Sequence, residues 1–143
     1  MKIRMTVNGM AVAVEAEPYR TLLEVLRDRL ELLGVREGCS AGECGTCTVL
    51  MNGKPVVSCL VLAPDAEGAE VTTIEGLAKD GKLDPMQEAF IQAGAIQCGF
   101  CTPGMIMAAK GGEVLEGNLC RCTGYSKILS AIRAQRSASG NDV

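Results

Sequence analysis

The chain contains no histidine and no tryptophan, and aromatic residues make up only 3% of its 143 residues. The absence of histidine removes the side chain that proteins use most often as a general base and as a neutral metal ligand. No G-x-G-x-x-G run is present either, so the usual dinucleotide-binding loop is missing. We therefore expect a core of aliphatic side chains and no catalytic residue in this chain.

Long apolar runs and a strong net charge are also absent. The apolar runs are far too short to span a bilayer, and the first ten residues are strand-like and lack the apolar core of a secretory signal. The net charge of −3 gives no reason to expect nucleic acid or an anionic membrane as a partner. We expect a cytoplasmic protein with no direct membrane insertion, with export alongside a partner as the alternative.

Cysteine is the residue that stands out, because eight of them fall into two sets of four. The first set is spaced C-x4-C-x2-C-x11-C and the second C-x2-C-x18-C-x-C. The first set is Cys39, Cys44, Cys47 and Cys59, and the second set is Cys98, Cys101, Cys120 and Cys122. The first three carry the spacing of plant-type ferredoxins, which hold a 2Fe-2S cluster. Four disulfides are a weaker interpretation, because a reducing cytosol keeps thiols free.

The first set favours iron–sulfur binding over a structural zinc site. A 2Fe-2S cluster held by four thiolates is negatively charged, so backbone N–H groups must surround it when it is buried. Gly38, Gly42 and Gly45 alternate with the first three cysteines and allow the loop to curl tightly. Zinc sites made of four cysteines usually pair two short C-x2-C-like knuckles, and C-x4-C-x2-C does not match that arrangement.

The second set lies just before two predicted helix starts, at Thr102-Pro103 and at Ser126. Helix N-termini offer free N–H groups and partial positive charge, which favour thiolates and an anionic cluster. On spacing alone, a zinc site or a redox dithiol stays open here. The plant-type motif in the same chain makes a second 2Fe-2S cluster the favoured interpretation.

The first 75 residues predict a mixed α+β unit. Two β-rich runs, 2–7 and 10–15, flank Asn8-Gly9, which is the strongest short hairpin signal. The same signal recurs at Asn52-Gly53, with Cys59 on the predicted return strand. Between the hairpins, a capping box predicts a helix, and after them comes one short strand. That helix runs from Thr21, with Glu24 three residues on, to Gly34, and the strand covers residues 70–74.

Residues 75–84 read as a connection to a helical region. Asp84 with Gln87 predicts one helix start, and Thr102-Pro103 and Ser126 predict two more. Gly111-Gly112 should end the middle helix.

Three motifs together resemble the small iron–sulfur subunit of the molybdenum hydroxylases, a family that includes xanthine dehydrogenase and aldehyde oxidoreductase. The motifs are GCSAGECGTCTVLMNG, QCGFCTPGMIMAA and GNLCRCTGYSKI. The resemblance implies an α+β fold with an N-terminal β-grasp 2Fe-2S ferredoxin domain at 1–76. It also implies a C-terminal all-α 2Fe-2S domain at 77–143, which in the family has four helices. Only Met105–Glu116 intervene between CTPG and GNLCRC here, fewer than is usual in the family, so we expect a shortened form or a gap in the sequence.

The resemblance also implies roles. Cys39, Cys44, Cys47 and Cys59 look like the ligands of a distal, more exposed cluster, and Cys98, Cys101, Cys120 and Cys122 like those of the cluster next to the molybdopterin. Gln97 stands where the glutamine of the family approaches the pterin, with a polar loop residue as the alternative. In such enzymes the molybdopterin lies on a large partner subunit. Electrons pass through the proximal and distal clusters to FAD, on another partner, or to a different acceptor.

The expected function is therefore that of the iron–sulfur subunit of a multi-subunit oxidoreductase, with no substrate site of its own. A free-standing two-cluster electron carrier and a structural zinc module are the alternatives. The sequence names neither the substrate nor the final acceptor.

Overall fold

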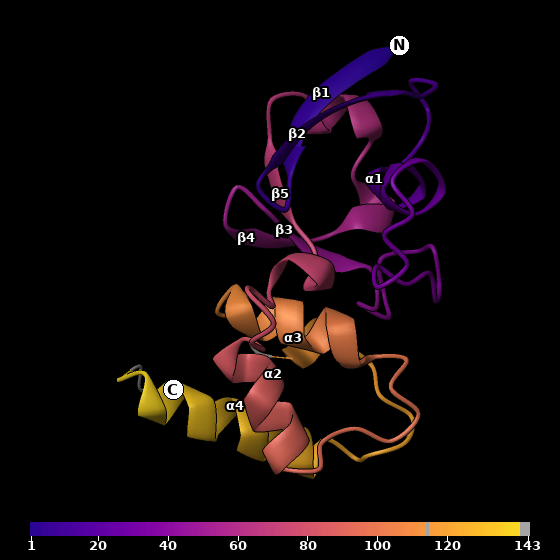
Figure 1. The fold of residues 1–143 in the computed structure, drawn as a ribbon. Coiled ribbons are helices and arrows are strands. Elements are labelled where there is room, and N and C mark those ends of the chain that lie inside the picture. The colour runs from indigo at the N-terminus through magenta and orange to yellow at the C-terminus, as the bar shows by residue number, and fades with distance from the viewer. Residues whose placement is uncertain (114, 141–143) are drawn as a thin grey trace.

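The computed structural model describes residues 1–113 and 115–140, which form a sheet-containing half followed by a helical half (Figure 1). The strands of the first half are β1 (Lys2–Val7), β2 (Met10–Glu15), β3 (Thr48–Met51), β4 (Lys54–Val57) and β5 (Glu70–Thr72). The α-helices are α1 (Leu22–Glu24), α2 (Pro85–Gln92), α3 (Thr102–Lys110) and α4 (Ser126–Ala138). No helix in the described ranges is long and apolar enough to cross a membrane.

The five strands form one mixed sheet in the order β2-β1-β5-β3-β4. β1 and β5 run parallel, and the other neighbouring pairs are antiparallel. Both predicted hairpins are confirmed. Asn8 and Gly9 have φ of 50° and 82°, and Asn52 and Gly53 have φ of 53° and 80°, as a type I′ turn requires.

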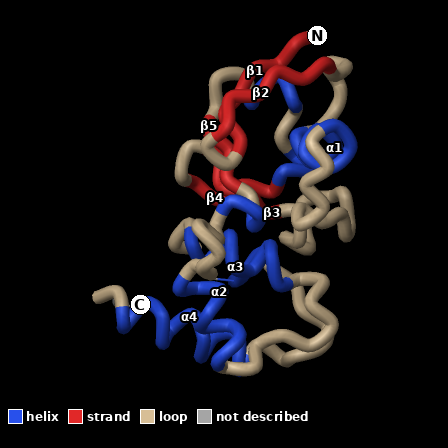
Figure 2. The backbone as a smooth tube through the Cα atoms, in the orientation of Figure 1, coloured by secondary structure: helices blue, strands red, loops and turns tan. Residues whose placement is uncertain are grey.

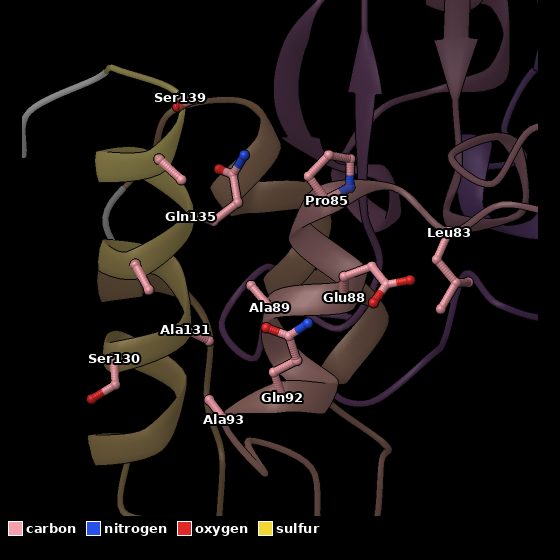
Figure 3. A pocket seen from close by; sticks show the side chains of 12 residues that line it. Leu83, Pro85, Glu88, Ala89, Gln92, Ala93, Ser130, Ala131, Gln135 and Ser139 are labelled. Carbon is pink, nitrogen blue, oxygen red and sulfur yellow. The ribbon is translucent and has the colours of Figure 1, made fainter.

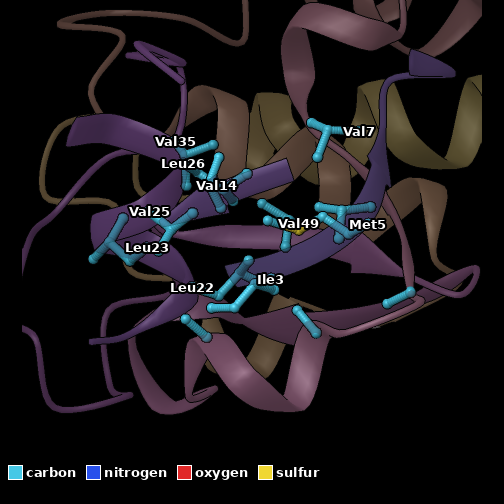
Figure 4. Close-up of a cluster of buried hydrophobic side chains, with 14 of the residues drawn as sticks. Ile3, Met5, Val7, Val14, Leu22, Leu23, Val25, Leu26, Val35 and Val49 are labelled. Carbon is cyan, nitrogen blue, oxygen red and sulfur yellow. The ribbon is translucent and has the colours of Figure 1, made fainter. Parts of the chain in front are cut away.

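One face of the sheet packs against the segment that contains α1 (Figure 4). Leu22 and Leu26 are fully buried there and contribute to the same apolar cluster as Ile3, Val49 and Val71. β1 alternates exposed and buried residues along its length, which places one side of the strand in this core. The first half therefore has a core of its own, built from aliphatic side chains as the sequence predicts.

The predicted helix from Thr21 to Gly34 begins where expected and ends early. The capping box between Thr21 and Glu24 is present, but α1 gives way to a π-helical turn at Val25–Arg29. Leu30 N–H bonds to the carbonyl of Val25, five residues back, at 3.2 Å. Residue 31 then takes a left-handed φ of 57°, which an L-residue cannot repeat along a right-handed helix.

Gly34 therefore does not end the helix. The absence of a side chain there allows another segment to approach the backbone closely. A Cβ at this position would lie 2.3 Å from the Ile74 Cγ2 and 2.8 Å from the Glu75 Oε1. The backbone N–H of Gly34 donates to the Glu75 carboxylate at 2.8 Å. This close approach ties the end of the first helical segment to the connection between the two halves.

Cys59 lies just beyond the second hairpin and not on its return strand as predicted. β4 ends at Val57, and Ser58–Leu60 form a 3-10 turn. The Ser58 hydroxyl donates to the carbonyl of Cys47 at 2.7 Å. This bond fixes the turn beside the cysteine loop, so Cys59 meets Cys47 from a turn.

The helical half starts as the sequence predicts. Asp84 and Gln87 form a capping box at the start of α2, and α3 ends at Gly111. α4 begins at Ser126, but no side chain caps it, because Tyr125 occupies the cap position with φ of 72°. Phe90 and Met105 are fully buried in a second apolar cluster, to which Ile128 of α4 also belongs.

The connection between α3 and α4 is short. Within its described residues it contains the turn at Gly111-Gly112 and one 3-10 turn at Leu115–Gly117. The described part of the helical half thus holds the α-helices α2, α3 and α4 with this turn, so a shortened form and a gap in the sequence both stay as predicted. The predicted fold class, a β-grasp-like mixed sheet followed by helices, is confirmed (Figure 2). The boundary between residues 76 and 77 stays a prediction.

Candidate metal centres

The loop that precedes β3 holds Cys39 in a ring of backbone donors. Three N–H groups point at the Cys39 sulfur, each at 3.3 Å. They belong to Ala41, Glu43 and Cys44. These donors, that of Ala41 foremost, lower the pKa of Cys39 to about 6. The loop therefore stabilises a thiolate at this position even without a bound metal.

Cys47 and Cys59 form the buried pair of the first set. Burial raises the pKa of Cys59 to about 11, and the hydrogen bond that the Cys59 thiol shares with Cys47 adds to the shift. The backbone N–H of Gly42 acts in the opposite direction on the same sulfur. Gly42 has φ of 78°, so the loop can turn its N–H inward here without backbone strain.

The second set brings together cysteines from two loops that are far apart in the sequence. Cys98 shares a hydrogen bond with Cys122, and Cys101 shares one with Cys120. Burial raises the pKa of Cys101 to about 12, with the Cys120 thiol as the next cause.

Cys120 has two further donors beside it. The Thr123 hydroxyl lies 3.0 Å from the Cys120 sulfur, and the Thr123 N–H donates to that sulfur at 3.4 Å. Burial would raise the pKa of Cys120, but these donors outweigh it and the pKa falls to about 7. The phenol oxygen of Tyr125 accepts the Cys120 N–H at 2.8 Å, which fixes the loop ahead of α4.

A cavity of about 230 Å³ lies where the two loops meet. All four cysteines of the second set line it, together with Cys44 of the first set. A larger hollow of about 790 Å³ lies between α2 and α4, but no cysteine lines it (Figure 3). Its lining consists of five alanines, five polar residues, Leu83 and Pro85, so the larger hollow is not the one that holds the candidate metal ligands.

The arrangement of the thiols fits two binuclear clusters. All eight cysteines are free thiols, and they lie in four pairs: Cys39 with Cys44, Cys47 with Cys59, Cys98 with Cys122, and Cys101 with Cys120. A 2Fe-2S cluster takes four thiolates for two irons, which is one pair for each iron. Over residues 1–113 and 115–140, no group of three or more histidine, cysteine or acidic side chains converges closely enough to hold a single metal ion.

The two sites are joined by hydrogen bonds to backbone carbonyls of the first loop. Leu119, the neighbour of Cys120, donates its N–H to the carbonyl of Cys44 at 2.9 Å. The buried Asn118 side chain donates to the carbonyl of Gly45 at 3.1 Å. Figure 1 places the loops of both sets on the same side of the molecule.

The two thiol sets differ in exposure. In this chain by itself, Cys47 and Cys59 are buried, and Cys39 is the exposed member of the first set. In the second set both Cys98 and Cys122 are exposed. The second set, predicted to be proximal, is therefore the more open one until a partner covers it.

Gln97 is exposed next to Cys98, so its side chain is free to meet a group outside this chain. The functional residues that sequence reasoning missed are Thr46 and Thr123, whose hydroxyls lie 3.2 Å and 3.0 Å from cysteine sulfurs. Thr123 is part of the quoted GNLCRCTGYSKI motif. A threonine within a few residues of a cysteine ligand is the signal that could have pointed to both.

Comparison with known proteins gives the same assignment. Residues 5–78 match the family described as 2Fe-2S iron-sulfur cluster binding domain, and residues 73–113 match the 2Fe-2S binding domain family. The fold and the two thiol sets thus define a protein that binds two 2Fe-2S clusters.

Relatives that match over most of their length identify the family within this class of proteins. The chain is 46% identical to the nicotinate dehydrogenase small FeS subunit of Eubacterium barkeri, over 92% of each chain. It is 49% identical to the xanthine dehydrogenase iron-sulfur-binding subunit of Escherichia coli O157:H7, over 91% of each. A chain of quinoline 2-oxidoreductase from Pseudomonas putida 86 superimposes with a TM-score of 0.90 at 40% identity, covering 100% of this chain and 98% of that one. The chain belongs to the family of iron–sulfur subunits of the molybdenum hydroxylases.

Proposed function

We propose that this chain is the electron-transfer subunit of a molybdenum hydroxylase. The observation that carries the proposal is the backbone contact between two thiol sets, in which the Leu119 N–H donates to the carbonyl of Cys44 at 2.9 Å. When bound, each 2Fe-2S cluster accepts and releases one electron. The chain supplies the thiolates, the N–H donors and the spacing, and it carries out no bond-making step.

The contact gives a short route between the sites. From the Cys44 sulfur, the route runs along that residue to its carbonyl, across the hydrogen bond to Leu119, and along one peptide to Cys120. A hydrogen bond couples two groups electronically far better than an open gap. The order of transfer then follows from which site faces the donor.

We assign the second set to the proximal position and the first set to the distal position. Cys98 and Cys122 are exposed in this chain alone, and the exposed Gln97 lies directly beside Cys98. A large molybdopterin subunit that covers this surface would bring the pterin to Gln97 and Cys98. Electrons would leave through the first set, where Cys39 is exposed.

The partners and the compartment are part of the same proposal. The relatives are described as small, beta or gamma subunits of dehydrogenase complexes, which supports at least one larger partner. An FAD-binding subunit is the acceptor we propose. The eight free thiols suit a reducing cytoplasm.

The test is metal analysis and EPR of the purified complex. We expect about four irons per copy of this chain and two distinct S = 1/2 signals on reduction, since each 2Fe-2S site contributes one. Cys44→Ser should abolish one signal and Cys120→Ser the other. Zinc in place of iron, or a single signal in the wild type, would overturn the proposal.

Co-purification separates a subunit from a free carrier. A tagged copy of this chain, expressed with its neighbouring genes, should retain a molybdenum-bearing chain through gel filtration. Two intact clusters without any retained partner would favour the free-standing carrier instead.

A further inference from the structure

We propose that the positive charge of Arg36 raises the reduction potential of the second cluster, the one held by the second set of cysteines. We also propose that the Arg36 side chain positions the loop from Cys98 to Cys101. This inference rests on the proposed function, because it assumes that both sites hold 2Fe-2S clusters. Arg36 belongs to none of the resemblance motifs and is no cysteine neighbour, so nothing in the spacing of the thiols points to it.

The backbone of Arg36 belongs to the first cluster loop. Its N–H donates to the Thr46 carbonyl at 3.4 Å, and its carbonyl accepts from the Thr46 hydroxyl at 3.2 Å. That hydroxyl also lies 3.2 Å from the Cys44 sulfur. The Thr46 hydroxyl therefore connects the main chain of Arg36 to Cys44, a predicted ligand of the first site.

The side chain of Arg36 reaches the other loop. Its guanidinium donates to the carbonyl of Gly99 at 2.5 Å and lies 5.6 Å from the centre of the Phe100 ring. Both residues stand between Cys98 and Cys101, and Phe100 also lines the cavity formed by the second set. A planar cation held by an acceptor and an aromatic face is fixed in orientation.

The charge of Arg36 has no carboxylate partner. No acidic side chain in the described ranges lies within 4.0 Å of its guanidinium, although other arginines, such as Arg20, form several such pairs. Arg36 is also partly shielded from solvent. An unpaired and partly buried guanidinium is unfavourable unless a negative group lies nearby, and an anionic cluster between Cys98 and Cys101 provides one.

The direction of the effect follows from charge. Reduction adds one electron and no proton to the cluster, so the reduced form is one unit more negative. A fixed positive charge beside it stabilises that form more than the oxidised form. Because the guanidinium is bonded inside the second loop, the second cluster should respond more than the first.

The test is an EPR-monitored redox titration of the purified complex carrying Arg36→Gln. Glutamine keeps an N–H donor for Gly99 and removes the charge. We expect the midpoint potential of the second cluster to become more negative by about 59 mV or more, which is a tenfold change in a one-electron equilibrium. The potential of the first cluster in the same sample serves as the internal reference and should move less.

Two matched variants decide what causes the shift. Arg4→Gln removes the same charge from an exposed position on β1 that pairs with Glu67, and it should leave both potentials unchanged. Arg36→Lys keeps the charge without the planar stacking, and it should stay closer to the wild type than Arg36→Gln does. If the second cluster does not load in Arg36→Gln, Arg36→Lys is compared with the wild type instead. The midpoint potential of the second cluster must then differ between these two proteins by less than about 59 mV.

The inference is wrong if both EPR signals are present at full intensity and Arg36→Gln leaves the second potential in place. It is equally wrong if Arg4→Gln, or Arg36→Lys, shifts that potential as far as Arg36→Gln does. Failure of the proposed function looks different, because the wild-type complex would then lack the two signals altogether.

Discussion

At the scale of single residues, the eight cysteines differ in how readily they give up a proton. Backbone donors hold the pKa of Cys39 near 6, and Thr123 holds that of Cys120 near 7. Burial has the opposite effect on the pKa of Cys59 and Cys101. Each site thus contains one cysteine with a lowered pKa and one with a raised pKa, which stays protonated until metal binds.

Alkylation of the cluster-free chain should reveal this difference. A pKa lowered from 9.0 means that Cys39 is a thiolate from about pH 6 upward, whereas Cys59, raised to about 11, stays protonated through pH 9. Iodoacetamide labelling, followed by peptide mass spectrometry from pH 6 to 9, should show Cys39 near its full rate at neutral pH and Cys59 labelled slowly throughout. The same titration in urea is the control, where the two rates should converge; parallel pH profiles in the folded chain would contradict the assignment.

At the scale of elements, two close contacts hold the helices in place. The first turn of α3 lies directly against the cysteine loop. A Cβ on Gly104 would be 2.4 Å from the carbonyl oxygen of Gly45 and 2.9 Å from the Cα of Thr46. Both are backbone atoms, so the clash cannot be relieved by rotating a side chain.

Gly104→Ala should therefore destabilise the protein. Alanine favours a helix over glycine by about 1 kcal/mol, but crowding of this kind costs about 1–3 kcal/mol, so we expect a net loss in thermal unfolding. Gly117→Ala is the matched control, because a Cβ there meets nothing within 4 Å. An unchanged or higher melting temperature for Gly104→Ala would show that the two halves separate easily at this contact.

The second close contact is a buried arginine on α4. Arg136 is 9% exposed, and its guanidinium donates to the carbonyls of Ala109 and Glu113 at the end of α3, at 3.3 Å and 3.1 Å. Ala109 also accepts the N–H of Gly112 at 3.1 Å, and Glu113 lies three residues beyond the end of α3, so the guanidinium ties α4 to the turn that follows α3.

Arg136→Met removes both hydrogen bonds and should lower the free energy of unfolding by about 1–3 kcal/mol, since each such bond contributes about 0.5–1.5 kcal/mol net. Arg133→Met removes an exposed arginine from the same helix and should change it by less than about 0.5 kcal/mol. Chemical denaturation of the two variants gives both numbers. Equal losses would mean that the contact with the end of α3 contributes nothing.

At the scale of the whole molecule, the two halves depend on their clusters to different degrees. In the first set, three of four cysteines lie in one loop, and the sheet has its own apolar core. In the second set, the cysteines join the loop before α3 to the loop before α4. In the helical half, cluster binding therefore joins two loops that supply two cysteines each, whereas in the sheet half it adds only the turn at Cys59 to a loop that already holds three.

Removal of both clusters with a chelator and a reductant should loosen the helical half more than the sheet. Hydrogen exchange followed by mass spectrometry should show a larger loss of protection in α3 and α4 than in β1 and β5. Re-loading with iron and sulfide should restore the original pattern. A uniform loss over both halves would indicate that the molecule unfolds as one unit.

The sequence predicted those parts of the molecule that depend on neighbouring residues. Both Asn-Gly hairpins and both capping boxes are confirmed, because each is set by residues within a few positions of one another. The helix that should have reached Gly34 ends early, and Gly34 itself is constrained by Ile74 and Glu75, some forty positions later, and not by a helix end. The bond from Leu119 to Cys44 and the reach of Arg36 to Gly99 are likewise contacts between distant segments, which no local pattern contains.

The pairing of thiols in the first site also gives its two ends different surroundings. One iron would be bound by Cys39 and Cys44 and the other by the buried Cys47 and Cys59. The three N–H donors around Cys39 would favour added negative charge at this outer pair of thiolates over the buried pair. Cys44 lines the cavity of the neighbouring site and Cys39 is exposed, so the outer pair would face both the second set and the molecular surface.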